Sequence, residues 1–131
     1  MSEIIGSRRE NGQQGAEYNL RQLIKAFKAQ AEPTRVRTLS LLMERECCVC
    51  EVAQALDISQ TRASRSLRVL YDAGFLKLRR AGLWALYSVD KEEMPAHLRG
   101  LVDVLHQALE GNEIIAQDRK RLRTVKRKFY A

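Results

Sequence analysis

The sequence lacks the features of a secreted or membrane-spanning protein. Its three cysteines all lie between positions 47 and 50 of the 131-residue chain, and an odd number of thiols spaced so closely cannot form a disulfide framework. No uncharged apolar run approaches the roughly 20 residues that span a bilayer. The N-terminal stretch has neither the apolar core nor the cleavage signature of a secretory signal. We therefore expect a cytoplasmic protein that does not associate with membranes.

The motifs of common enzyme classes are missing as well. The chain contains no glycine-rich phosphate loop, no His-Glu-x-x-His zinc motif and no nucleophile elbow. Each of these motifs places a nucleophile, a metal or a phosphate at a defined spacing. We expect a protein that is not an enzyme and that uses no organic cofactor.

Positive charge is what the chain has in excess. It carries 23 Lys and Arg against 16 Asp and Glu, a formal net charge of +7, while 45% of its residues are hydrophobic. That hydrophobic fraction is typical of an ordinary globular chain. A small domain this basic points first to nucleic acid as its partner.

Apolar residues recur at three- and four-residue spacing along most of the chain, which indicates helices. We expect a flexible N-terminal segment at 1–15, a DNA-binding and dimerisation domain at 16–110, and a basic C-terminal tail at 111–131 that is helical in part. Pro33 suits the first position of a helix, because its missing N–H needs no partner there. Ser59 is a favourable N-cap for a later helix.

A change of period after Gly74 predicts a β-hairpin. Aromatic and apolar residues flank the turn at 80–82, in the stretches 75–79 and 83–89. A short helix at 47–56, a tight connection and the helix that begins at Ser59 precede this hairpin. The predicted fold is mainly α with a small β-hairpin wing, a winged helix-turn-helix with the element order α-α-α-α-β-β-α.

The helix that begins at Ser59 is the candidate recognition helix, the helix that would enter the major groove of DNA; we name it the reading helix. If Ala63, Leu67 and Leu70 face the core, its outward side carries arginine, amide and hydroxyl groups. Arginine can bind guanine through two hydrogen bonds, and amide or hydroxyl groups can reach base edges or phosphates. The hairpin adds basic groups placed for phosphates or a minor groove. The candidate DNA-binding residues are Ser59, Gln60, Thr61, Arg62, Ser64, Arg65, Arg68, Lys77, Arg79 and Arg80.

These residues resemble the ArsR/SmtB family of metal- and metalloid-responsive repressors. The resemblance covers about 23–89, over half of the chain, and several short stretches carry it together. They are Glu32-Pro33-Thr34-Arg35, Glu46 to Val52, Ser59-Gln60, Ser64 to Leu70, Ala73-Gly74-Phe75-Leu76, and Gly82-Leu83-Trp84 with Tyr87-Ser88.

The resemblance implies a homodimer on double-stranded operator DNA with an imperfect inverted repeat, released when a metal or metalloid binds. It also implies that the first and last helices of the domain form the dimer interface. The apolar stripe at 98–109 fits this, because so short a chain has little core left to cover it; packing on its own domain is the alternative. The candidate interface residues are Leu20, Leu23, Leu98, Leu101, Val102, Leu105 and Leu109.

The cysteine cluster is the candidate ligand site. Arsenic-responsive members of the family carry a Cys-Val-Cys core, which Cys48 and Cys50 match, and a third Cys three residues on, where this chain has Ala53. We hypothesise that Cys47 supplies the third ligand. The resemblance implies trivalent arsenic (arsenite) or antimony (antimonite) as the inducer, and both are thiophilic. A redox-responsive repressor, a zinc- or cadmium-sensing repressor and inert buried thiols remain alternatives.

Helix geometry predicts how such a site works. In a helix that runs through 47–50, Cys48 and Cys50 point roughly 200° apart, since each residue turns by about 100°. Three sulfurs then cannot lie on one side of an ion, so we expect ligand binding to unwind the first helical turn. The helix N-terminus and nearby Arg45 are expected to lower the thiol pKa values.

Two further features leave their roles open. Asp103 and His106 lie three apart on the last helix of the domain, where the resemblance places a second metal site, although the spacing differs and a second His is missing. A polar surface position is the simpler interpretation. The basic tail fits either contact with the DNA flanks or a solvated helix face.

Overall fold

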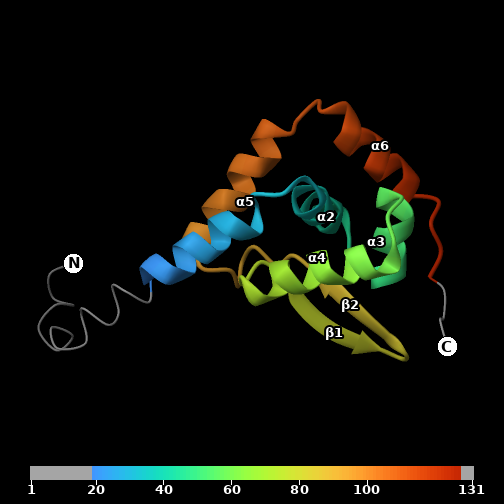
Figure 1. The fold of residues 1–131 in the computed structure, drawn as a ribbon, viewed down its shortest axis with the longest axis horizontal. Coiled ribbons are helices and arrows are strands. Elements are labelled where there is room, and N and C mark those ends of the chain that lie inside the picture. Colours follow the sequence, from blue (N-terminus) through green and yellow to red (C-terminus); the bar gives the residue numbers. More distant parts are fainter. Residues whose placement is uncertain (1–18, 128–131) are drawn as a thin grey trace, which may run out of the picture.

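The computed structural model describes residues 19–127 (Figure 1). A helix occupies residues 19–29. The elements that follow are α2 (Pro33–Glu44), α3 (Val49–Leu56), α4 (Gln60–Asp72), β1 (Lys77–Ala81), β2 (Trp84–Ser88), α5 (Ala96–Ala108) and α6 (Glu113–Leu122). This mainly helical architecture with one two-stranded hairpin confirms the predicted fold class.

Helix α6 extends the predicted element order by one element. It lies in the basic segment 111–131. Gly111, at φ 79°, ends the preceding turn, and Asn112 then caps α6 by accepting hydrogen bonds from the N–H groups of Ile114 and Ile115 at 3.0 and 3.1 Å. The predicted flexible segment 1–15 lies outside the described residues.

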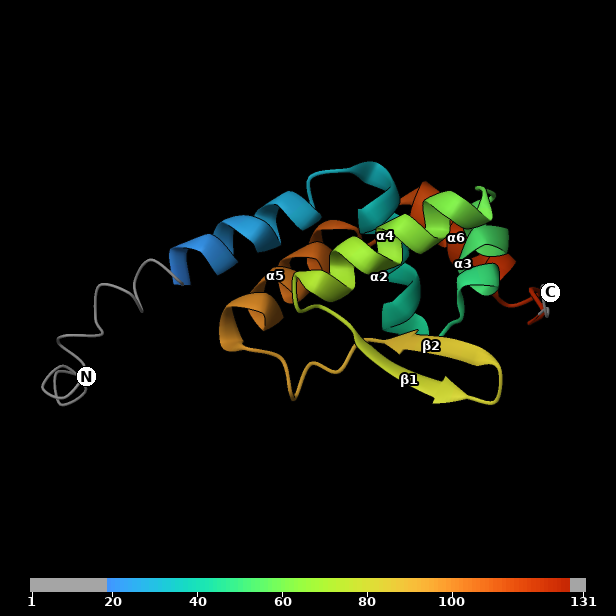
Figure 2. The same ribbon diagram turned by 60° about the horizontal axis from the view of Figure 1, so that its bottom comes forward.

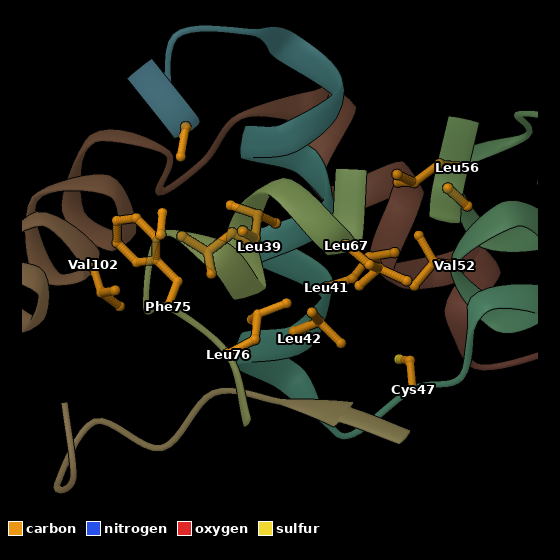
Figure 3. Packing of buried hydrophobic residues seen from close by; sticks show 14 of the residues in the cluster. Leu39, Leu41, Leu42, Cys47, Val52, Leu56, Leu67, Phe75, Leu76 and Val102 are labelled. Carbon is orange, nitrogen blue, oxygen red and sulfur yellow. The ribbon is translucent and has the colours of Figure 1, made fainter. Parts of the chain in front are cut away.

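Helix α2 forms the centre of the fold. It contacts α3, α4, α6 and β2, and its Leu39 and Leu41 are fully buried. Figure 3 shows these side chains in one cluster with Leu67, Phe75 and Val102, which come from α4, the segment after it and α5. The shared core therefore fixes the reading-helix candidate α4 against α2. Between residues 19 and 127, no helix has the length and apolar character needed to cross a membrane.

The hairpin projects beside α4 as a separate arm (Figure 2). Its antiparallel register pairs Ala81 with Trp84, so Gly82 and Leu83 form the turn, with Gly82 at φ 62°. On its other edge β2 meets the chain just before α3. There Cys47 and Tyr87 exchange two backbone hydrogen bonds, at 3.0 and 2.8 Å. The hairpin is thereby attached directly to the cysteine cluster.

Candidate functional site

Helices α3 and α4 form a helix-turn-helix with a tight connection. Asp57 ends α3 in the left-handed region, at φ 56° and ψ 51°, which aspartate tolerates better than most residues. Ser59 then caps α4, because its Oγ accepts a hydrogen bond from the N–H of Arg62 at 3.1 Å. Both residues are local signals in the sequence, which is why this part of the fold could be predicted.

The predicted outward side of α4 lies at the surface. Ala63, Leu67 and Leu70 are buried beneath it. The Arg62 side chain already makes one hydrogen bond within the chain, since its Nη2 donates to Thr34 Oγ1 of α2 at 2.7 Å. Within residues 19–127 the side chains of Arg65 and Arg68 make no hydrogen bond or ion pair. The exposed candidate residues of this surface are Ser59, Gln60, Thr61, Arg62, Arg65 and Arg68, and Ser64 is half-buried.

The basic residues of the hairpin differ in how they are bound. Lys77 forms ion pairs with Asp90 and Glu93, at 3.0 and 2.6 Å. Arg79 binds the Glu46 carboxylate through two guanidinium nitrogens, Nε and Nη2, each at 2.7 Å. This contact holds the pKa of Glu46 below its usual range. Arg80 is exposed and, among the described residues, has no such partner. Lys77 and Arg79 must exchange a carboxylate for a phosphate to contact DNA, whereas Arg80 needs no exchange.

The helix at the cysteine cluster begins two residues later than the sequence suggested. Helix α3 begins at Val49, Cys48 is its N-cap in an extended conformation, and only Cys50 is helical. The expected 200° separation is therefore wrong. Because Cys48 stands outside the helix, its Sγ lies 2.9 Å from Sγ of Cys50.

The three thiols belong to two different clusters. Cys48 and Cys50 pack with Leu86 of the hairpin and lie against Trp84, with 3% and 2% of their surfaces exposed. Cys47 belongs instead to the main core, at the edge of the cluster in Figure 3. No group of three or more His, Cys, Asp or Glu within 19–127 is arranged to hold a metal ion. Two thiols are thus assembled in advance and the third is not.

The thiol pKa values also differ from the sequence expectation. Burial raises the pKa of Cys47 to about 12, and burial together with the contact to Cys50 raises the pKa of Cys48 to about 12. The predicted lowering by the helix N-terminus and Arg45 is wrong, because loss of hydration outweighs both. Arg45 does lower the pKa of Cys47, but by less than burial raises it.

Thiol alkylation tests this environment. Thiolate is the reactive form, so we expect alkylation of Cys47 and Cys48 by iodoacetamide in the folded, reduced protein to be slow at pH 7. The rate should rise about tenfold per pH unit from pH 7 to 9, since both pH values lie far below the raised pKa. Tandem mass spectrometry of the peptide reads each cysteine separately. A rate that levels off near pH 8 contradicts the raised values.

Sequence reasoning missed a buried carboxylate beside the thiols. Glu51 accepts hydrogen bonds from the N–H of Cys48 at 2.9 Å, from Arg45 at 3.1 Å and from Arg127 at 3.1 Å. Burial opposes its ionisation, but the bonds from Cys48 and Arg127 hold its pKa below the usual range. A glutamate three residues after a helix cap is a recognisable signal, so its contact with Cys48 could have been found. The contact with Arg127 could not.

The candidate interface residues fall into three groups by burial. Leu98 and Val102 lie in the core of this chain, whereas Leu20 is 61% exposed. The remaining candidates, Leu23, Leu101, Leu105 and Leu109, are half-buried.

Other apolar side chains extend the exposed surface on the same two helices. Ile24 and Phe27 are 45% and 50% exposed, and Val104 of α5 is 60% exposed. The 19–29 helix and α5 lie side by side in both ribbon views (Figures 1 and 2). We name the exposed Leu20, Ile24, Phe27 and Val104 the apolar face.

Asp103 and His106 have different neighbours among the described residues. Asp103 is paired with Lys91, and His106 is exposed beside a cavity of about 220 Å³ that Glu44, Arg119 and Lys91 also line. Both are surface positions of α5, which agrees with the simpler interpretation.

Comparison with known proteins points to one family. A family model described as "Bacterial regulatory protein, arsR family" matches residues 32–78, from the N-cap of α2 into β1. An arsenic resistance transcriptional regulator of Pseudomonas putida is 44% identical over 81 residues, which are 59% of this chain and 63% of that protein. The match thus spans less than two thirds of the Pseudomonas protein.

Two further relatives extend the comparison. A cadmium resistance transcriptional regulatory protein homologue of Staphylococcus aureus is 39% identical over 95 residues, 70% of this chain and 75% of that protein. Among solved structures, a homodimeric winged helix-turn-helix DNA-binding domain of Mycobacterium bovis superposes with a TM-score of 0.62 at 26% identity. It covers 73% of this chain and 85% of its own, and is described as a possible ArsR-family transcriptional regulator.

Proposed function

The chain belongs to the ArsR family of bacterial transcriptional regulators, and from this premise we propose that it is a dimeric repressor that trivalent arsenic or antimony releases from operator DNA. One observation carries the proposal. The sulfurs of Cys48 and Cys50 lie 2.9 Å apart at the start of the helix-turn-helix, which suits a soft, thiophilic ion.

The proposed DNA contact uses the outward side of α4 in a major groove. Arg65 and Arg68 project from this side with guanidinium groups that no residue of 19–127 binds, and Arg65 is our choice for a base contact through two hydrogen bonds. Arg80 of the hairpin is placed for a backbone phosphate. Gln60, Thr61 and Ser64 can add polar contacts.

The proposed dimer presents two such helices to an inverted repeat, since the symmetry of a DNA site mirrors that of its protein. The apolar face supports dimerisation: large exposed apolar side chains on two adjacent helices are a typical interaction surface. The homodimeric state of the Mycobacterium bovis domain points the same way.

A charge on the apolar face should dissociate the dimer. We expect Ile24→Glu to yield monomers at micromolar concentration, because a buried unpaired carboxylate costs several kcal/mol. Leu83→Glu is the matched control, since Leu83 is 72% exposed in the turn of the hairpin, which belongs to neither helix of this face. Native mass spectrometry measures the oligomeric state. A dimeric Ile24→Glu variant contradicts the proposed interface.

The proposed ligand chemistry is an exchange without oxidation or reduction. The Cys48 and Cys50 thiols each replace one hydroxyl of arsenous acid: an As–O bond breaks, an As–S bond forms, and the thiol proton leaves with the hydroxyl as water. Cys47 makes the third exchange and completes a pyramidal three-thiolate centre.

Recruitment of Cys47 accounts for the release of DNA. To turn its sulfur out of the core, Cys47 must disturb its backbone bridge to Tyr87 of the hairpin. A ligand on the other two thiols also crowds Leu86, which packs against them. Both effects move the hairpin relative to α4. This mechanism replaces the unwinding of the first turn, which presumed that the helix includes Cys47 and Cys48.

A DNA-release assay tests the proposal. The reduced protein selects a preferred duplex from a random-sequence pool, and fluorescence anisotropy then follows binding to that labelled duplex as arsenite is added. We expect the affinity to fall by about 10–100-fold, the usual range of allosteric coupling. Affinity that arsenite and antimonite leave unchanged contradicts the proposed function.

A redox-responsive repressor is the second candidate. The separation of 2.9 Å between the Cys48 and Cys50 sulfurs favours it, because peroxide could convert the adjacent thiols to a disulfide, with two waters released. Release of DNA by hydrogen peroxide and its reversal by dithiothreitol, without a response to arsenite, would establish this alternative.

A further inference from the structure

Helix α6 carries a buried carboxylate that the proposed mechanism does not use. Asp118 is 1% exposed. Arg37 of α2 binds it through two nitrogens, each at 2.8 Å, and Arg121 binds the same carboxylate at 2.8 Å. Such an arrangement compensates the buried charge, but it does not by itself stabilise a fold, so its placement calls for another reason.

The two arginines that bind Asp118 also donate hydrogen bonds to the end of α3. The last four carbonyls of any helix lack partners within the helix. Here the N–H groups of Asp57 and Ile58 satisfy those of Gln54 and Ala53. The last two are satisfied from outside: Ala55 by Nε of Arg121 at 2.6 Å, and Leu56 by Nη2 of Arg37 at 3.2 Å.

The clamped carbonyls directly precede the turn into α4. Only Asp57, Ile58 and Ser59 separate Leu56 from the first residue of the reading helix. Cationic groups at a helix C-terminus also interact favourably with its dipole. Whatever orients the two guanidinium groups therefore orients the turn from which α4 starts.

The other end of α3 is held by the same C-terminal part of the chain. Arg127 binds Glu51 of the first turn, and the carbonyl of Lys126 accepts a hydrogen bond from Gln54 at 2.8 Å. Helix α3 is thus fixed at both ends by residues of 118–127. These lie outside the stretch that the family model matches.

We infer that Asp118 is a positioning residue for DNA reading: it holds Arg37 and Arg121 on the last turn of α3, and so sets the orientation of α4. Asp118 touches no DNA in this arrangement. The inference rests on the proposed function, because it concerns the affinity of α4 for a preferred duplex. It gives the basic C-terminal segment a role in the helix-turn-helix itself, in place of contact with the DNA flanks.

Two variants test the inference in the full-length protein. Asp118→Asn removes the charge that holds both arginines. Arg121→Lys keeps all charges but loses the planar fork that bridges Asp118 and Ala55, and it serves if the first variant fails to fold. Arg123→Lys is the matched control, because Arg123 is exposed at the end of the same helix.

The measurement compares two DNAs at a temperature well below thermal unfolding. We expect about tenfold weaker binding of the wild-type-selected duplex and less than twofold weaker binding of random-sequence duplex, since specific contacts depend on orientation and phosphate contacts depend on charge. Hydrogen exchange should increase at residues 55–60. The control should match the wild type in each measurement.

The contrary outcomes are distinct. Unchanged affinity for the selected duplex in both variants overturns the inference and leaves the proposed function intact. Equal losses on both DNAs also overturn it, because they indicate general destabilisation. If the wild type prefers no duplex, the proposed function fails and this inference fails with it.

Discussion

Cys48→Ala should abolish the response to arsenite, while Cys47→Ala should bind arsenite and yet fail to release DNA. The difference follows from where the sulfurs lie. Cys48 and Cys50 form the preassembled pair. The loss of either leaves one thiol of the pair and Cys47 in a separate cluster, which is no preassembled chelate. Cys47 lies in another cluster and exchanges backbone hydrogen bonds with the hairpin. Its sulfur is therefore needed to couple arsenite binding to DNA release, and not for the initial binding of arsenite.

The comparison needs DNA binding without arsenite as its baseline. Each variant should bind the selected duplex within about twofold of wild type, because no cysteine contacts the DNA surface and alanine is a small apolar replacement. With arsenite, we expect the wild type to lose about 10–100-fold in affinity and both variants to lose less than about twofold. Mass spectrometry should detect arsenic on Cys47→Ala and not on Cys48→Ala. Full release by Cys47→Ala contradicts the role given to Cys47.

Arg65→Ala should weaken binding of the selected duplex by about 5–150-fold, since one two-bond contact to guanine contributes about 1–3 kcal/mol of discrimination. Binding of random-sequence duplex should weaken far less. The basis is the Arg65 guanidinium, which lies on the exposed side of α4 and has no partner in the described part of the chain. Arg123→Ala is the charge-matched control, because it removes one arginine from the surface of α6.

Salt dependence separates the two roles that Arg65 can have. A base contact leaves the slope of log affinity against log salt nearly unchanged, whereas loss of one phosphate contact reduces it by about one. Equal losses on both DNAs with a reduced slope assign Arg65 to a phosphate. The base contact must then come from another residue of α4.

The helix-turn-helix and hairpin could be predicted because their signals are local. The Ser59 cap and the Gly82 turn each lie within a few residues of the element they define. The burial of Ala63, Leu67 and Leu70 likewise follows from helical spacing alone.

The thiol geometry could not be predicted, because it depends on a helix boundary that differs by two residues. A start at Val49 instead of Cys47 brings two sulfurs together that a continuous helix would separate. Helix ends are the least certain part of any sequence-based assignment. The raised pKa of Cys48 has a different cause, since burial raises it and part of that burial comes from Leu86, which is distant in sequence.

The role of α6 was hidden for a third reason. Arg37 and Asp118 are 81 positions apart, and nothing in either local sequence pairs them. The basic composition of the tail suggested surface charge, whereas Arg121 and Arg127 are bound to carboxylates of the chain itself. Composition gives the amount of charge in a segment, and only the fold shows which groups the charged side chains bind.

Native mass spectrometry of the reduced protein during arsenite titration tests the central claim most directly. We predict a dimer that gains one arsenic per chain with the loss of three hydrogens per arsenic, together with release of a bound selected duplex. A loss of two hydrogens with release places the ligand on Cys48 and Cys50 alone and contradicts the recruitment of Cys47. No uptake of arsenic, with release only after oxidation or on addition of zinc or cadmium, contradicts the metalloid-responsive function.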